Sequence, residues 1–469
     1  MNILHISAEC YPLAKVGGLA DVVGALPKYQ NGLGQEASVI MPFYNLKFFN
    51  ENTFDVVYKA RLKMGESNID FSILKLTSLN LGFDMYCVDI RPLLYQDNVY
   101  SNDDTKRFLA FQIAVLDWIK SLTKKPEVIH CHDHHTGLVP FMVQQCYDYK
   151  ILRNTPTVLT IHNAQYQGWF GYEHLNLLPE FNHDHIGLLD WDGTINPLAV
   201  AIKCAWRVTT VSQSYMEELQ NEANGLEALL KHESAKCIGI LNGIDTEVWD
   251  PMNDEYLEKN YKVTSVLSGK KGNKKYLCQQ FNLDPSKPLI SFIGRLVGEK
   301  GADILPQVFE SILKQESCNI LLLGSGFDET EKALLALKDE FKGNYNVYVG
   351  YNEQLSHIIY AGSDFLIMPS RVEPCGLNQM YALRYGTIPI VRSIGGLIDT
   401  VTDIDDNGFG IRHKEVSVKS SSRAIERGID LHANTTKFND IRKRIMKIDH
   451  SWDVSAKAYV YLYNSIINP

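Results

Sequence analysis

Short apolar runs alternate with amphipathic stretches along most of this chain, and the runs fall into two series. The first series occupies residues 3–6, 37–41, 85–88, 128–131, 158–161, 208–211 and 237–241. The second occupies residues 289–293, 320–323, 347–349, 365–368 and 388–391. Strands that alternate with helices predict mostly parallel sheets covered by helices on both faces. The predicted fold class is therefore α/β, with one mostly parallel sheet for each series.

A polar, lysine-rich segment separates the two series. It runs from Pro251 to about Asn282 and lacks the strand pattern, so we place a domain junction just before it. The sequence predicts a first domain over residues 1–245, a second over 246–449, and a C-terminal helix within 450–469. We expect that amphipathic, aromatic helix to pack on the first domain. We interpret the lysines of the polar segment as a solvated helix face: Lys270, Lys271, Lys274 and Lys275.

Composition and charge exclude several classes of function. The formal net charge of −9 argues against a nucleic-acid-binding surface. No apolar run approaches membrane-spanning length, and the first residues have the pattern of a strand rather than of a signal peptide. The nine cysteines form no Cys-x-x-Cys pair, which favours reduced thiols and a cytoplasmic location.

Two similar glycine pairs lie near opposite ends of the chain. Residues 15–21 read Lys-Val-Gly-Gly-Leu-Ala-Asp, and residues 395–399 read Gly-Gly-Leu-Ile-Asp. Glycines before a helix leave backbone N–H groups uncovered at its N-terminus, where an anion is favoured. A simple turn is the alternative explanation for either pair alone. The repeat suggests that the two halves of the chain are built alike.

Ligands of parallel sheets bind beyond the carboxyl ends of the strands, so the residues after each apolar run are candidates for a site. In the first half these are Asp133, His162 and Asn242. In the second half a glycine-flanked loop carries Arg295 and Lys300. A guanidinium and an ammonium suit a diphosphate and could offset the charge on a departing phosphate without a metal. A surface ion pair is the alternative.

Glu373 is the candidate carboxylate of the second half. It opens the sequence Glu-Pro-Cys-Gly-Leu over residues 373–377, in which proline and glycine fix the backbone. A negative charge here could stabilise a cationic, sugar-like transition state or hold a sugar hydroxyl. The alternatives are a helix N-terminal acid for Glu373 and a buried, hydrogen-bonded histidine for His162.

The histidine-rich run at residues 130–135 raises the question of a metal site. It reads His-Cys-His-Asp-His-His and begins within a predicted strand. Because neighbours on a strand point in opposite directions, these residues cannot all converge on one ion, and we predict no metal site. The dinucleotide fingerprint Gly-x-Gly-x-x-Gly is missing after the first strand, and so is a Walker phosphate loop, which disfavours hydride transfer and ATP hydrolysis.

Taken together, these motifs resemble the bacterial glycogen synthase and plant starch synthase family, whose members are retaining glucosyltransferases of the GT-B type. The resemblance implies two Rossmann-like, doubly wound parallel-sheet domains that face each other across a cleft. The resemblance runs nearly end to end. It is carried by residues 15–22, 132–138, 160–163, 241–245, 295–301, 369–377 and 395–397. It implies transfer of glucose from ADP-glucose to the non-reducing 4-hydroxyl of an α-1,4-glucan, with no metal and no other cofactor.

The resemblance also implies roles for individual residues. Arg295 and Lys300 would bind the diphosphate and stabilise the leaving ADP, beside the N–H groups of Gly395 and Gly396. Glu373 would contact the donor glucose. Further donor-binding positions implied are Lys15, Gly17, Gly18, Asn242, Cys375, Gly376 and Leu377. Asp133, His162 and Asn242 would line the sugar and acceptor side, and we expect closure by hinge motion near residues 242–251 and through the C-terminal tail.

Several positions depart from the family pattern. His134 replaces a tryptophan near the acceptor side, and Ile394 replaces a threonine before the second glycine pair. Tyr381 stands eight residues after Glu373, where a related GT-B group has a second glutamate, so glycogen synthase is favoured over that group. The alternatives are a retaining GT-B enzyme that uses UDP-glucose or a small acceptor, and a non-catalytic protein that binds a nucleotide sugar or glucan.

Overall fold

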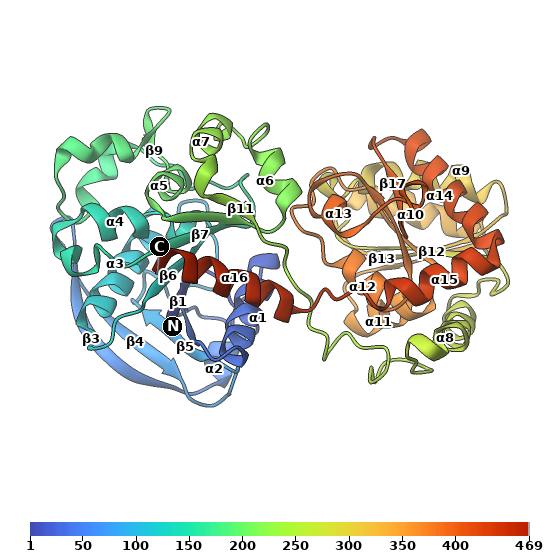
Figure 1. Cartoon of the computed structure of the whole chain (residues 1–469), viewed down its shortest axis with the longest axis horizontal. Coiled ribbons are helices and arrows are strands. Elements are labelled where there is room, and N and C mark those ends of the chain that lie inside the picture. Colours follow the sequence, from blue (N-terminus) through green and yellow to red (C-terminus); the bar gives the residue numbers. More distant parts are fainter. Residues whose placement is uncertain (468–469) are drawn as a thin grey trace. The chain divides into compact units, whose positions relative to one another are not determined.

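The computed structural model describes residues 1–467 and divides the chain into two compact units. Unit 1 comprises Met1–Asn242 together with the C-terminal segment that begins at Trp452, and unit 2 comprises Gly243–Ser451. Figure 1 shows the chain coloured along its sequence. Across residues 1–467, no helix is both long enough and apolar enough to cross a membrane.

Unit 1 is built on a nine-stranded sheet in the order β11-β10-β7-β6-β1-β2-β5-β4-β3. The strands in this order are Cys237–Gly239, Arg207–Thr210, Thr157–Ile161, Val128–His132, Asn2–Ile6, Glu36–Pro42, Asp84–Asp89, Ser67–Leu76 and Phe54–Met64. All neighbours pair in parallel except β3 with β4 and β4 with β5. The strand order reverses between β1 and β6, which is where ligands bind in such sheets.

The long hairpin of β3 and β4 is absent from the sequence prediction. Most of β3 is exposed or half-buried, so its residues alternate without a continuous apolar run. A strand of this kind gives a weaker signal than the central strands, which are buried on both faces.

Helices cover the sheet of unit 1. The main ones are α1 (Gly18–Gly32), α3 (Thr105–Ser121), α4 (Val139–Gln145), α5 (Pro197–Cys204), α6 (Gln213–Leu219) and α7 (Glu227–His232). The last helix of the chain, α16 (Trp452–Ile467), belongs to the same unit and lies beside α1, as the dark red and blue ribbons of Figure 1 show. Its side chains Trp452, Tyr459 and Tyr463 are buried in one apolar cluster with Val22 and Leu26 of α1.

Unit 2 contains a six-stranded, fully parallel sheet in the order β14-β13-β12-β15-β16-β17. The strands in this order are Tyr345–Val349, Asn319–Gly324, Leu289–Ile293, Phe365–Met368, Ile388–Arg392 and Ile411–His413. Its helices are α8 (Val266–Phe281), α9 (Leu305–Leu313), α10 (Asp328–Glu340), α11 (Glu353–Gly362), α12 (Asn378–Arg384), α13 (Gly395–Thr400), α14 (Val418–Ala433) and α15 (Thr435–Ile445). The strand order reverses between β12 and β15.

The interpretation of the lysine cluster as a solvated face is wrong for part of helix α8. Lys270 is buried, and its ammonium donates to the carbonyl oxygens of Tyr360 and Tyr385 and to Thr387 Oγ1, at 3.0, 3.1 and 2.6 Å. Burial holds the pKa of Lys270 well below its usual range. Neighbouring lysines on a helix point in different directions, so a lysine-rich segment can still bury one member against carbonyl groups.

Candidate active site

Three neighbouring strands of unit 2 carry the candidate residues of the second half. The loop after β12 holds Arg295 and Lys300, the loop after β15 holds Glu373, and α13 begins after β16 with Gly395 and Gly396. Because β12, β15 and β16 are adjacent and parallel, these three loops lie at one edge of the sheet. The predicted residues of unit 2 therefore gather at the point where the strand order reverses.

Glu373 is held by a bidentate ion pair. The Lys300 ammonium lies 2.7 Å from each carboxylate oxygen of Glu373, and the Ser370 hydroxyl donates to Oε2 at 2.8 Å. The Glu373 side chain is buried, whereas 26% of the Lys300 side chain is exposed. The carboxylate is thus fixed in place, and its lysine partner remains accessible from one side.

Arg371 ties the two loops together. Its guanidinium donates to the Gly298 carbonyl at 2.6 Å and forms two hydrogen bonds with the Asp303 carboxylate, and its backbone N–H donates to the Glu299 carbonyl at 2.7 Å. The turn that carries Lys300 is therefore fastened to the loop that carries Glu373. This role of Arg371 was not predictable from the sequence, because its partners are set by the tertiary fold.

Arg295 is much more exposed. Its side chain is 69% exposed and pairs with Glu299 at 3.2 Å, one helical turn away in sequence. An exposed pair of this type contributes about 1 kcal/mol or less, so the guanidinium can leave it for an anionic ligand at little cost.

The glycine-rich segments of unit 2 pack too closely for side chains. A Cβ on Gly396 would lie 2.1 Å from the Cys375 carbonyl oxygen, and the Gly396 N–H donates to the Glu373 carbonyl at 3.1 Å. Gly376 has a φ of +70°, which favours glycine. The chain then enters α12 through Leu377, the residue before its first turn. The close contact between segments 373–377 and 395–396 is thus possible because glycine has no side chain.

In unit 1, Asp133 and His162 follow the adjacent strands β6 and β7. Asp133 Oδ1 accepts a hydrogen bond from the His162 backbone N–H at 2.7 Å. Burial, opposed by backbone hydrogen bonds and reinforced by the charge of Glu9, raises the pKa of Asp133 to about 7. Asp133 also has a φ of +57°, a backbone strain that a non-glycine residue adopts rarely and often at functional sites.

The imidazole of His162 is buried and neutral at physiological pH. Desolvation lowers the pKa of His162 to about 3. Its Nε2 lies 3.0 Å from Nδ1 of His132, a strand residue of β6. Asn242, after β11, is also buried, and its Oδ1 has no hydrogen-bond partner among residues 1–467.

The first glycine pair is already occupied by a carboxylate of the chain. Glu9 Oε2 accepts hydrogen bonds from the N–H groups of Val16 and Gly17, at 2.5 and 3.0 Å, and Glu9 Oε1 accepts from Tyr100. Helix α1 begins at the next residue, Gly18. Lys15 forms an exposed ion pair with Asp21 at 2.7 Å. Glu9 was not among the predicted site residues, although its position shortly after the first strand was a visible signal.

The second glycine pair is held differently. The carbonyl of Glu373, and not a carboxylate, accepts from the Gly396 N–H. The two glycine pairs are therefore alike in sequence and position but differ in what holds them.

Within the described chain, one group of three histidines has donor atoms close enough to consider a metal ion. His5 of β1 and His130 and His132 of β6 have ring nitrogens within 4.8 Å of one another. The run at residues 130–135 contributes only two members, as the alternation of strand side chains predicts. Every ring nitrogen of the three is engaged in a hydrogen bond, so a metal would have to displace existing partners.

Comparisons with known proteins agree with this architecture. Residues 2–232 match the family model described as the starch synthase catalytic domain, and residues 273–443 match glycosyl transferases group 1. Two parallel-sheet units with these matches define a glycosyltransferase of the GT-B class.

Full-length relatives narrow the class to a family. The chain is 54% identical over 470 residues to a glycogen synthase of Flavobacterium johnsoniae, covering 100% of this chain and 99% of the relative. It is 38% identical to a glycogen synthase of Bacillus cereus, with full coverage of both chains. The chain belongs to the glycogen and starch synthase family, and its function is that of a glycogen synthase.

Solved structures of other proteins share the fold of this chain. The catalytic domain of starch synthase IV from Arabidopsis thaliana, bound to ADP and acarbose, superposes with a TM-score of 0.88 at 31% identity and covers 100% of this chain and 99% of that one. A sucrose-phosphate synthase from Thermosynechococcus elongatus, at 16% identity and a TM-score of 0.62, shares the fold and covers 99% of this chain and 98% of its own.

Proposed function

We propose that the chain transfers glucose from ADP-glucose to the non-reducing 4-hydroxyl of an α-1,4-glucan with retention of configuration. The observation that carries the proposal is the buried Glu373 carboxylate, held by Lys300 and Ser370 directly beside the cationic loop after β12. This places a fixed negative charge and two cations at one edge of the sheet. The structure of the starch synthase IV catalytic domain bound to ADP and acarbose supports the proposal.

Unit 2 supplies the groups for the nucleotide diphosphate. Arg295 and Lys300 bind the diphosphate, with Gly395, Gly396 and the segment Cys375, Gly376 and Leu377 lining the donor beside them. As the bond between the sugar C1 and the phosphate oxygen breaks, negative charge develops on the departing ADP. The guanidinium and the ammonium stabilise that charge, and Glu373 stabilises the positive charge on the glucosyl ring.

Residues of unit 1 act on the sugar and the acceptor. Asp133, His162 and Asn242 bind hydroxyl groups. Lys15, Gly17 and Gly18 contribute to donor binding by lining the donor, while the Gly17 N–H stays bonded to Glu9. The acceptor 4-hydroxyl attacks C1 from the face that the phosphate leaves, and its proton passes to the departing phosphate oxygen. The new bond joins the acceptor oxygen to C1, so configuration is retained and no enzyme nucleophile is needed. We place the reaction in the cytoplasm, which the nine free cysteines support.

A donor panel tests the proposal. The purified protein is incubated with glycogen and radiolabelled ADP-glucose or UDP-glucose, and label in the polymer is measured. We expect labelling from ADP-glucose, and loss of it in Glu373→Ala but not in the control Glu310→Ala, an exposed glutamate of α9. No labelling from either donor would contradict the proposal. Binding of ADP-glucose with turnover unaffected by Glu373→Ala would favour a non-catalytic site at this carboxylate.

A further inference from the structure

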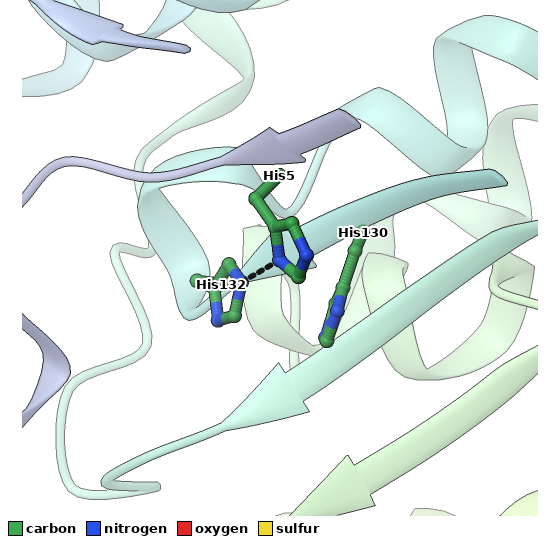
Figure 2. Close-up of side chains that lie close together, drawn as sticks. All are labelled: His5, His130 and His132. Atoms are coloured by element: carbon green, nitrogen blue, oxygen red, sulfur yellow. Dashed lines mark hydrogen bonds between the residues drawn. The ribbon is translucent and has the colours of Figure 1, made fainter. Parts of the chain in front are cut away.

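A cluster of three histidines lies in the core of unit 1, away from solvent. Figure 2 shows His5 of β1 together with His130 and His132 of β6, and the dashed line joins His5 Nδ1 to His132 Nε2 at 3.0 Å. All three are fully buried. None of them was assigned a role above, yet His132 also contacts His162, so the cluster leads directly to a residue of the proposed site.

The donor and acceptor of each hydrogen bond in the cluster can be assigned by starting from the Leu159 carbonyl oxygen, which can only accept. Thr209 Oγ1 lies 3.2 Å from the Leu159 carbonyl oxygen and 2.6 Å from Thr160 Oγ1. Because the carbonyl can only accept, we assign the Thr209 hydrogen to it, which makes Thr160 Oγ1 the donor to Thr209. With its one hydrogen given to Thr209, Thr160 Oγ1 accepts from Nε2 of His130 at 2.6 Å and from the Tyr459 hydroxyl at 3.4 Å. His130 therefore carries its proton on Nε2.

The other nitrogen of His130 extends the chain to helix α16. Nδ1 of His130 accepts from the Tyr463 hydroxyl at 2.7 Å. That hydroxyl in turn accepts from the Gln30 amide nitrogen at 3.3 Å. The amide oxygen of Gln30 consequently faces His5 and accepts from its Nε2 at 2.8 Å. The donor assignment that starts at the Leu159 carbonyl therefore determines the donors at Tyr463, Gln30 and His5.

The last links reach His162. With its proton on Nε2, His5 accepts at Nδ1 from Nε2 of His132, and His132 accepts at Nδ1 from Nε2 of His162 at 3.0 Å. This assignment requires each imidazole to be neutral. Burial lowers the pKa of His5 to about 4 and that of His162 to about 3, and it holds the pKa values of His130 and His132 well below their usual range.

We propose that Tyr463, Gln30, His5 and His132 form a relay that fixes His162 as the Nε2–H tautomer, with Nδ1 as a hydrogen-bond acceptor. The four are positioning residues, since they act on substrate only through His162. An acceptor at Nδ1 binds a sugar hydroxyl, which can donate, and rejects a phosphate oxygen, which cannot. The inference rests on the proposed role of His162, and it names the class of substrate group that His162 recognises.

The same three histidines could be read as a metal site. Filling it would break the bonds of His130 with Tyr463 or Thr160 and the bond between His5 and His132, all of them buried. Leaving a buried polar group without a hydrogen-bond partner destabilises the folded protein, so the closed set of hydrogen bonds favours the relay over a metal site.

The relay is tested by the tautomer of His162 in solution. Nitrogen-15 NMR of the full-length protein distinguishes the two neutral tautomers, and the His162 signal is assigned by its loss in His162→Gln. We expect Nε2–H only in the unmodified protein. Tyr463→Phe removes the hydroxyl that orients Gln30, so both amide orientations become similar in energy and His162 should populate both tautomers. Tyr461→Phe, on the exposed face of the same helix, is the matched control and should leave the signal unchanged.

Turnover gives an independent readout. Tyr463→Phe should lower kcat about twofold, in proportion to the competent tautomer. His132→Phe removes the acceptor for His162 and should lower kcat about tenfold, as loss of one good hydrogen bond does. His132→Asn restores an acceptor oxygen and should recover most of the rate. Folding of each variant is verified by its thermal transition.

The outcomes separate the relay from the proposed function. A proton on Nδ1 of His162 in the unmodified protein, or one tautomer retained in Tyr463→Phe, overturns the relay even if His162→Ala is inactive. Stoichiometric zinc in the purified protein that is lost in His5→Gln also overturns it. If the tautomer responds as expected while His162→Ala keeps full turnover, the relay stands and the role of His162 in the proposed function fails.

Discussion

Lys300 Nζ lies 2.7 Å from both carboxylate oxygens of Glu373, so one ammonium bridges the whole carboxylate. The same lysine is proposed to bind the donor diphosphate, and a quarter of its side chain is exposed for that contact. In this proposal one cation interacts with both the carboxylate of the protein and the diphosphate of the ligand. This pairing links the two halves of the proposed chemistry, in which Glu373 stabilises the glucosyl cation and Lys300 the departing phosphate.

Replacing Lys300 by alanine should weaken transition-state stabilisation strongly. We expect a loss of about 3 kcal/mol, roughly a hundredfold in kcat/KM, because one preorganised cation is removed from a developing charge. The control is Lys314→Ala, which removes an exposed lysine from its ion pair with Glu310. Steady-state kinetics with ADP-glucose measure the effect, and an unchanged kcat/KM would refute the role of Lys300.

Replacing Arg295 by alanine should lower kcat/KM by a similar amount, about 3 kcal/mol, without lowering stability. Its side chain is largely exposed and its ion pair with Glu299 contributes little to folding. Arg295→Lys should recover only part of the rate, because an ammonium cannot form the bidentate grip of a guanidinium. Arg61→Ala, which breaks an equally exposed ion pair on β3, serves as the control. A full rescue by lysine would argue against bidentate binding.

Asp133 should make folding stability depend on pH. Its pKa is raised to about 7 in the folded chain, so between pH 4 and pH 7 the folded state holds a proton that the unfolded state has released. Stability therefore falls as pH rises through this window. One pKa unit corresponds to about 1.4 kcal/mol, which sets an upper limit of about 4 kcal/mol for the loss.

The variant Asp133→Asn isolates this effect. It should be more stable than the unmodified protein at pH 8, with the difference vanishing near pH 4, when urea unfolding is measured across that range. Asp55→Asn, an exposed position of β3, is the control and should show no such divergence. Parallel stability curves for Asp133→Asn and the unmodified chain would contradict the raised pKa.

Lys15→Ala should impair turnover more than it weakens binding of free ADP. We assign the main diphosphate contacts to unit 2, whereas Lys15 belongs to unit 1 and is held by Asp21 in an exposed ion pair. Calorimetric titration with ADP and steady-state kinetics measure the two quantities. Equal losses in ADP affinity and in kcat/KM would show that Lys15 is a primary diphosphate ligand.

Gly396→Ala should destabilise unit 2 and abolish donor binding. The added methyl group would meet the Cys375 carbonyl, a backbone atom that cannot turn away, so the two segments must move apart. The control is Gly298→Ala in the nearby cationic loop, where a Cβ would meet no atom within 4 Å. Thermal unfolding and ADP titration test the pair of variants. A Gly396→Ala chain that binds ADP normally would contradict the need for close contact.

Much of the fold could be predicted because the central strands are buried on both faces. Strands β1, β6, β7, β12 and β15 are short apolar runs, and the α/β class follows from their alternation with helices. The position of a residue directly after such a strand places it at the carboxyl edge of the sheet, so the neighbourhoods of Asp133 and Glu373 were predictable too.

The features that could not be predicted depend on strand pairing and on contacts between residues far apart in the sequence. The β3–β4 hairpin is too exposed to give an apolar run. The contacts of Glu9 with Val16 and Gly17 require a tight loop that composition does not encode. The relay joins Tyr463 to Gln30 across 433 positions of sequence, and no local pattern reports such a pairing.

The placement of α16 has a consequence for how the chain is made. Unit 1 is interrupted after Asn242 and resumes at Trp452, while unit 2 is continuous. Tyr459 and Tyr463 belong to an apolar cluster that also contains residues of the first strand and helix. During synthesis, unit 2 can therefore complete its core while unit 1 still awaits its last helix. Strand β1 and helix α1 are synthesised long before α16, so the apolar surface that they share with it stays open to chaperones until α16 packs.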